Sequence, residues 1–196
     1  MTFAKTLRRK LEAMPSGSFI RVSDFLSDNK GSVVGSAFSR LRKSGVIDRV
    51  TKGVYWKPAS SRFGKGKPMP VDIGMRVAPK KAPGFAGASA AHALGLTTQI
   101  PIRPEIAVVG SRPASYSGAL FRMRSNAARD RLNPLEIAVL EIARDRFAHV
   151  EVDHSEIKPR LVRLSDDGRI DLGKICEVSM GETLAVRAFV RDLARA

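Results

Sequence analysis

The chain has 196 residues, 43% of them hydrophobic, and a formal net charge of +15 at pH 7. This length allows one large or two small domains, and the hydrophobic fraction excludes a wholly disordered chain. No apolar stretch approaches the ~20 residues that cross a bilayer, and the N-terminus lacks the apolar segment of a secretory signal, so we expect a cytoplasmic protein without a membrane partner.

The positive charge is unevenly distributed along the chain. Residues 1–58 carry 12 Lys and Arg against 4 Asp and Glu, a net of +8, and residues 59–84 carry 6 against 1, a net of +5. Residues 85–196 carry 16 against 14, a net of only +2. A strongly basic segment favours a polyanionic partner such as nucleic acid. The sequence therefore predicts that partner for the N-terminal part and a different role for the rest.

The first 31 residues have the pattern of two short helices and a turn. Apolar residues recur at helical spacing from Phe3 to Met14, which predicts an amphipathic first helix that stops at Pro15. Residues 22–28 predict a short second helix, and Asn-Lys-Gly at residues 29–31 predicts a turn.

The segment 32–43 predicts a third helix with two unlike faces. Val34, Phe38 and Leu41, together with Ala37, form an apolar stripe that faces a core. The opposite face holds hydroxyls and cations without a carboxylate: Ser32, Ser36, Ser39, Arg40 and Lys43. A merely solvated helix face usually mixes both signs of charge. This face therefore predicts a recognition helix that enters the major groove of duplex DNA.

A hairpin pattern follows this helix. Residues 46–50 and 54–56 are rich in β-branched and aromatic residues and flank a glycine-containing turn, which predicts two paired strands. Helix, helix, turn, helix and hairpin is the order of a winged helix-turn-helix, which we predict for residues 1–58. In this fold Arg49, Lys52 and Lys57 contact DNA phosphates, and these contacts set the register and supply salt-dependent affinity. For each of these cations a merely solvated role is the alternative.

Two further regions complete the predicted organisation. Residues 59–84 are rich in Gly, Pro and Lys, which predicts a basic linker or an extended arm along DNA, with one short helix or strand at residues 71–77. Residues 85–196 mix helical and strand patterns. The predicted fold class is therefore α+β, in which the winged helix-turn-helix is joined by a basic Gly/Pro linker to a mixed α/β C-terminal domain.

Several elements are predicted within this C-terminal domain. Residues 87–94 predict an alanine-rich helix, and three strands are predicted at residues 98–101, 105–109 and 119–124. In the last strand we expect Arg122 and Arg124 on the solvated face. Asn-Pro-Leu-Glu at residues 133–136 predicts a capped helix start, and residues 179–182 repeat this pattern before a final helix.

No residues form a recognisable catalytic or metal-binding group. The three histidines are scattered and share no metal-ligand spacing with the acids or with Cys176, the single cysteine. Residues 64–67 lack the full spacing and the Ser/Thr of a phosphate-binding loop. We therefore expect no enzyme activity, no metal and no cofactor. A metal-dependent nuclease is the alternative from another class of protein.

Two blocks of the sequence resemble a known family. Residues 37–50 (AFSRLRKSGVIDRV), followed by Gly53-Val54-Tyr55, resemble the winged helix of AbiEi-type antitoxins. Residues 87–101 (GASAAHALGLTTQIP) resemble the start of the C-terminal domain of that family. The second block is the more specific of the two, because many bacterial winged helices share the first.

The resemblance implies a transcriptional repressor that is the antitoxin of a type IV toxin–antitoxin, or abortive-infection, system. Its N-terminal domain would bind inverted repeats of double-stranded DNA in its own promoter. Its C-terminal domain would counteract a nucleotidyltransferase-like toxin, and a stable complex with that toxin is not required. The alternative is a stand-alone winged-helix regulator whose C-terminal domain binds a ligand or mediates oligomerisation.

Overall fold

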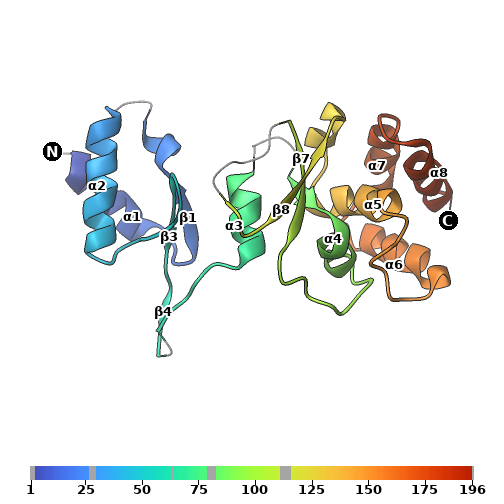
Figure 1. Ribbon diagram of the computed structural model, residues 1–196, viewed down its shortest axis with the longest axis horizontal. Helices are drawn as coiled ribbons and strands as arrows, with labels where there is room; N and C mark the ends of the chain where they lie inside the picture. The colour runs from blue at the N-terminus through green and yellow to red at the C-terminus, as the bar shows by residue number, and fades with distance from the viewer. Residues whose placement is uncertain (1–2, 27–29, 63, 79–82, 111–115, 196) are drawn as a thin grey trace. The chain divides into compact units, whose positions relative to one another are not determined.

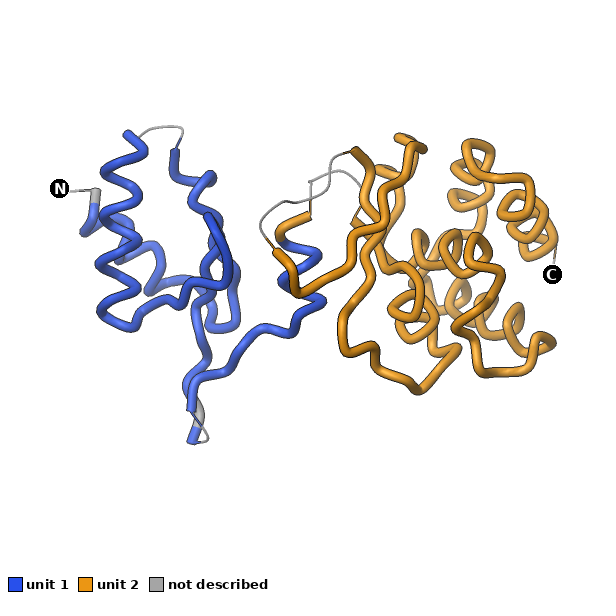
Figure 2. The backbone as a smooth tube through the Cα atoms, in the orientation of Figure 1, with its two compact units in different colours: residues 1–76 blue, residues 77–196 orange. Residues whose placement is uncertain are grey.

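The computed structural model describes residues 3–26, 30–62, 64–78, 83–110 and 116–195 (Figure 1). The structure is of mixed α+β type, and the chain divides into two compact units, residues 1–76 (unit 1) and residues 77–196 (unit 2) (Figure 2). Within the described residues, no helix is both long and apolar enough to cross a membrane. The boundary between the units falls inside residues 59–84, the stretch that the sequence predicts as a linker or arm.

Unit 1 begins with a helix, a strand and a short 3-10 helix. These elements are α1 (Phe3–Ala13), β1 (Ser18–Arg21) and η1 (Val22–Phe25). β1 is not predicted from the sequence. η1 lies where the sequence predicts the second helix, but residues 27–29, which include the end of that helix and the start of the predicted turn, lie outside the described residues, as does the side chain of Phe3.

A 13-residue helix, α2 (Gly31–Lys43), follows and corresponds to the predicted third helix. Its apolar stripe is buried as expected, and Phe38 is fully inaccessible to solvent. The Phe38 ring centroid lies 5.6 Å from that of Phe25 and 5.0 Å from that of Tyr55. The core of unit 1 joins α1, α2 and the strands: Leu7, Leu11, Ile20, Val34, Ala37, Phe38, Leu41 and Ile47. Packing therefore fixes α2 from one side only.

The sheet of unit 1 has three strands in the order β1-β3-β2, and all neighbours are antiparallel. β2 (Asp48–Thr51) and β3 (Val54–Lys57) form the predicted hairpin, which starts two residues later than expected. Gly53 in its turn has a φ of +74°, a conformation that glycine adopts without steric cost.

The stretch after β3 contains regular structure. β4 (Ser60–Ser61) and β5 (Gly64–Lys65) pair as a small antiparallel hairpin. The helix α3 (Pro70–Val77) follows and matches the short element predicted at residues 71–77.

Unit 2 is built around a second three-stranded sheet. β6 (Gly84–Phe85) pairs antiparallel with β7 (Glu105–Val109), and β7 pairs parallel with β8 (Leu120–Arg124). The helices α4 (Gly87–Ala93) and α5 (Pro134–Arg144) contact these strands.

The remaining elements of unit 2 are helical. They are η2 (Ala127–Arg131), α6 (His154–Asp166), α7 (Leu172–Ser179) and α8 (Leu184–Leu193). The predicted helix start at Asn133 is confirmed. The Asn133 side chain accepts a hydrogen bond from the Glu136 amide at 2.9 Å, and Glu136 accepts one from the Asn133 amide at 2.7 Å, which is a complete capping box.

Two local predictions for unit 2 are wrong. Residues 98–101 are not a strand, because the Glu151 carboxylate binds this segment through the Thr97 hydroxyl, the Thr98 amide and the Gln99 side chain. Residues 179–182 do not cap the last helix. Ser179 ends α7, the N-cap of α8 is residue 183, and the Glu182 carboxylate is used elsewhere.

Candidate nucleic-acid interface

The exposed face of α2 is the first part of the candidate interface. All five residues predicted for this face are exposed: Ser32, Ser36, Ser39, Arg40 and Lys43. The sequence has no acidic residue between positions 29 and 47, so no carboxylate from this stretch lies among them. A polyanion can therefore approach this face without meeting a negative charge from the helix.

Arg40 lies at the edge of this face. At 3.6 residues per turn, Ser39 and Lys43 are opposite the buried stripe, whereas Arg40 is turned toward one flank. There it lines a groove of about 300 Å³ together with Lys5 and Arg8 of α1. The groove places three cations along the flank where the two helices meet, of which Arg8 is paired with Glu12 of α1 at 2.8 Å. Arg40 thus belongs to a basic edge that two helices share.

The β2–β3 hairpin is the second part of the candidate interface. Arg49 and Lys52 are exposed, as predicted. The Arg49 guanidinium makes a long contact within the same strand, 3.4 Å from its Nε to the Thr51 carbonyl oxygen. The amide of Val22 at the start of η1 donates to the Gly53 carbonyl at 2.9 Å. The hairpin turn is therefore fixed beside the helices of the same unit.

Lys57 has a different role from the predicted phosphate contact. Its ammonium donates to three carbonyl oxygens at the end of α1, those of Leu11 at 2.8 Å, Glu12 at 2.8 Å and Met14 at 2.6 Å. The last carbonyls of a helix lack partners within the helix and carry partial negative charge. The Lys57 side chain therefore caps α1, and we remove it from the interface.

Replacing Lys57 with methionine should destabilise unit 1. The substitution keeps the length of the side chain but leaves the three carbonyls without their donor, so we expect a loss of about 1–2 kcal/mol in the free energy of unfolding. Trp56 is the only tryptophan of the chain and lies in β3, so its fluorescence during urea unfolding reports on this unit. An unchanged midpoint and slope would contradict the capping role.

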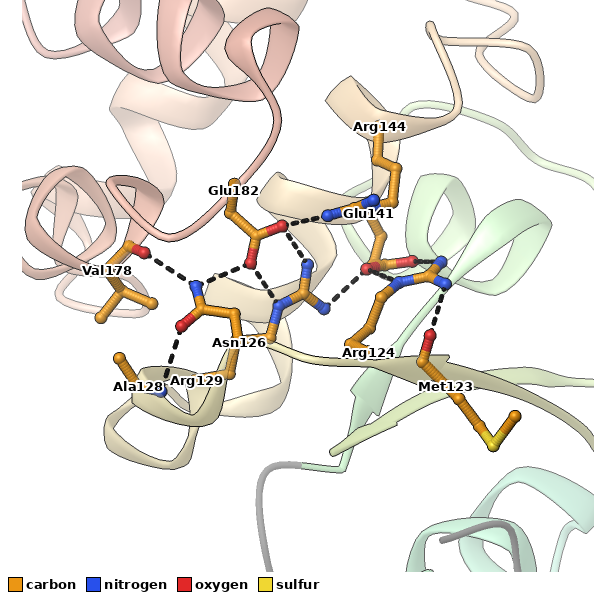
Figure 3. A network of polar contacts seen from close by, with 9 residues as sticks. All are labelled: Met123, Arg124, Asn126, Ala128, Arg129, Glu141, Arg144, Val178 and Glu182. Atoms are coloured by element: carbon orange, nitrogen blue, oxygen red, sulfur yellow. Dashed lines mark hydrogen bonds and ion pairs between the residues drawn. The ribbon is translucent and has the colours of Figure 1, made fainter. Parts of the chain in front are cut away.

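A third feature, in unit 2, is a network of buried charges (Figure 3). Arg129 is 1% exposed, and its guanidinium binds Glu182 at 2.7 and 2.9 Å and Glu141 at 2.7 Å. Arg124 of β8 also pairs with Glu141, and Arg144 of α5 also pairs with Glu182. Both glutamate side chains have no exposed surface. The network ties β8, η2 and α5 to the α7–α8 connection.

The two central groups hold each other in the charged state. Burial alone would raise the pKa of Glu182, but the hydrogen bonds and charge of Arg129, with help from Asn126 and Arg144, hold that pKa below its usual range. Burial alone would lower the pKa of Arg129, but Glu182 and Glu141 raise it. Because the cationic and anionic groups satisfy one another and have little contact with solvent, we assign the network a structural role.

Of the two arginines expected on the solvated face of the last strand, Arg122 is exposed as predicted, with 53% of its side chain accessible, whereas the network holds Arg124 largely away from solvent. The Arg124 side chain is only 15% exposed, and Arg122 pairs with the largely buried Glu105 at 2.6 Å. β8 also exposes an apolar side chain, that of Met123. One signal in the sequence points to the network. Glu141 interrupts an otherwise apolar helical run at a core position, and a buried carboxylate requires a partner.

Comparison with known protein families gives a match that covers nearly all of unit 1 and the start of unit 2. Residues 6–112, more than half of the chain, match the model described as a family of unknown function, DUF6088. The chain belongs to the DUF6088 family. The matched part of this DUF6088 protein includes the α2 face, both hairpins of unit 1 and β7 of unit 2. The buried charge network lies outside it.

Two other comparisons add little to this family assignment. No curated protein matches the chain. Among solved structures, the crystal structure of the RV2827C protein from Mycobacterium tuberculosis matches this DUF6088 protein with 17% identity and a TM-score of 0.46, and the match covers 97% of this chain and 76% of that chain. Among the described residues, no three His, Cys, Asp or Glu side chains are grouped so that they could hold a metal ion.

Proposed function

We propose that this DUF6088 protein binds double-stranded DNA and that unit 1 is a winged helix-turn-helix. In this proposal η1 and α2 are the helix pair, α2 is the recognition helix, and the β2–β3 hairpin is the wing. The element order supports it, since a helix, a strand, a helix pair and a hairpin follow one another along the chain. Arg49 and Lys52 contact the backbone from the wing, and Ser32, Ser36, Ser39 and Lys43 approach the groove.

The observation that carries the proposal is the two-sided character of α2. One stripe is buried, so the helix is held rigidly, and the other face is exposed and free of carboxylates. Small hydroxyl residues allow a close approach to base edges, while the cation at Lys43 attracts phosphates. Arg40 at the flank, beside Lys5 and Arg8, is suited to a phosphate of the neighbouring backbone.

The biological role that we propose is that of a repressor of its own operon. The resemblance to AbiEi-type antitoxins supports this role and extends it, because unit 2 would then counteract a nucleotidyltransferase-like toxin. A nucleotidyltransferase-like gene beside this one favours the antitoxin role. Its absence favours the alternative of a stand-alone regulator. Growth during co-expression of the neighbouring gene, with and without this chain, distinguishes the two.

Binding to DNA should depend steeply on salt. With roughly six phosphate contacts per protomer, the logarithm of the association constant should fall with the logarithm of salt concentration with a slope of about −5. Fluorescence anisotropy of a labelled duplex from the upstream region of the gene, measured between 50 and 300 mM salt (roughly the range in which such slopes are resolved), tests this. A flat response would remove the electrostatic basis of the proposal.

A further inference from the structure

The β4–β5 hairpin, residues 59–66, is a small basic projection of unit 1 that the proposed function does not yet use (Figure 1). Its strands pair Ser60 with Lys65 and Ser61 with Gly64. One more backbone hydrogen bond, from the Gly66 amide to the Ala59 carbonyl at 2.8 Å, closes its base. The stretch is therefore a hairpin and not the extended linker that its composition suggests.

Two side-chain hydrogen bonds attach this hairpin to the rest of unit 1. The Trp56 indole donates to the Gly66 carbonyl at 3.0 Å, and the Lys65 ammonium donates to the Gly45 carbonyl at 3.0 Å. Trp56 lies in β3, and Gly45 directly follows the end of α2. The hairpin is therefore held at the C-terminal end of α2, beside the last turn that carries Lys43.

The charged residues in this part of the chain are all basic. Between Asp48 and Asp72 the sequence has no acidic residue and six Lys or Arg. Three of these cations belong to the hairpin and its exit, and all three are exposed: Arg62, Lys65 and Lys67. The strands and base of the hairpin are otherwise formed by small residues, Ala59, Ser60, Ser61, Gly64 and Gly66, which lets their backbone approach a surface closely; residue 63 lies outside the described residues. A cationic edge built on small residues fits a phosphate backbone.

The two hairpins of unit 1 lie at opposite ends of β3. The β2–β3 turn precedes β3 and accepts a hydrogen bond from the first residue of η1. The β4–β5 hairpin follows β3 and donates a hydrogen bond, through Lys65, to Gly45 just after the end of α2. A helix of 13 residues is about 20 Å long. The major groove is about 12 Å wide. The helix is therefore longer than the groove is wide, and the two hairpins are anchored toward its two ends, one at the 3-10 helix that precedes it and one just beyond its C-terminal end.

We propose that the β4–β5 hairpin is a second phosphate-binding arm for duplex DNA, which contacts the backbone on the side of the groove opposite to the wing. Arg62 and Lys67 supply the contacts, and Lys65 holds the hairpin against the end of α2. This inference rests on the proposed DNA-binding function. The second arm adds a contact to the phosphate backbone and lengthens the footprint on DNA, but it adds no sequence preference.

The test removes the two contacting cations and keeps Lys65, which fixes the hairpin. The double variant Arg62→Ser with Lys67→Ser should bind about tenfold more weakly at 0.1 M salt to a duplex that the wild-type chain selects from a random-sequence pool, and its salt slope should be shallower by about 2. Hydroxyl-radical footprinting should lose protection at one edge only of the stretch covered by each protomer. The preferred sequence should stay the same.

A matched control removes two exposed cations from unit 2, with Arg191→Ser and Arg195→Ser. It has the same net charge as the hairpin variant and should keep the wild-type slope and footprint. The Trp56 emission spectrum checks that the hairpin remains seated, because its indole bonds to Gly66. A hairpin variant with wild-type slope and footprint, or a control that loses as much affinity, overturns the inference.

Failure of the inference can be told apart from failure of the proposed function. If substitutions on the α2 face abolish binding and the hairpin variant binds like wild type, only the second arm is rejected. If the wild-type chain selects no duplex, the proposed function is rejected; if it binds but neither set of substitutions changes binding, the α2 face is rejected as the DNA-binding surface together with the second arm.

Discussion

Replacing Ser39 and Lys43 with glutamate should reduce the affinity for duplex DNA by about 100-fold or more. Both residues are exposed on α2, opposite its buried stripe. The double substitution removes a cation and introduces two carboxylates where the phosphates approach, and such like-charge contacts cost several kcal/mol. An electrophoretic mobility shift with the upstream duplex measures the change.

A second pair of substitutions in unit 1 controls for net charge. Thr6→Glu with Arg9→Glu makes the same change of three charge units at exposed positions of α1. This variant should retain most of the affinity, because Thr6 and Arg9 do not line the flank beside Arg40. Equal losses in both variants would mean that overall charge, and not the α2 face, governs binding.

Replacing Arg129 with methionine should destabilise unit 2 by about 3–5 kcal/mol, because it removes the most buried cation of the network and leaves Glu141 and Glu182 only partly compensated, by Arg124 and Arg144. The substitution breaks the three hydrogen bonds from its guanidinium to Glu182 and Glu141. Cys176, the single cysteine, lies half-buried in α7. The rate at which its thiol is labelled in increasing urea therefore reports on the unfolding of this unit.

The neighbouring Arg131 offers a control for the same substitution. It pairs with Glu177 at 2.7 Å, but both side chains are more than half exposed. Exposed pairs contribute about 0–1 kcal/mol, so Arg131→Met should leave the labelling profile almost unchanged. If Arg129→Met behaves like Arg131→Met, the buried network does not stabilise unit 2.

The elements that the sequence predicts well are those with a strong local signal. The apolar stripe of α2 repeats over several turns, Gly53 marks the turn of the hairpin, and Asn133 with Glu136 forms a capping box. Each signal lies within a few neighbouring residues, so it can be recognised without knowledge of the fold. The five residues predicted for the α2 face are exposed for the same reason.

The features that the sequence does not predict depend on partners far along the chain. β1 exists because it pairs with β3, more than 30 residues later. Lys57 looks like one more surface cation until its contacts with the end of α1 are seen. Glu182 has the spacing of a helix cap but is bound by Arg129, 53 positions away. Side-chain periodicity carries no information about such pairings.

The position of Glu182 also limits how the chain can be shortened. This carboxylate comes from the connection that leads into α8, yet it compensates arginines of η2 and α5, more than 35 positions earlier. A protein that stopped after α7 would keep most of its secondary structure, but the buried Arg129 would retain only Glu141 as a partner and Arg144 would lose its carboxylate. Because such deletions also remove the buried side chains of α8, the effect of the carboxylate itself is seen by comparing two neighbouring deletions: we expect a chain that ends at residue 181 to give less soluble protein than one that ends at residue 182.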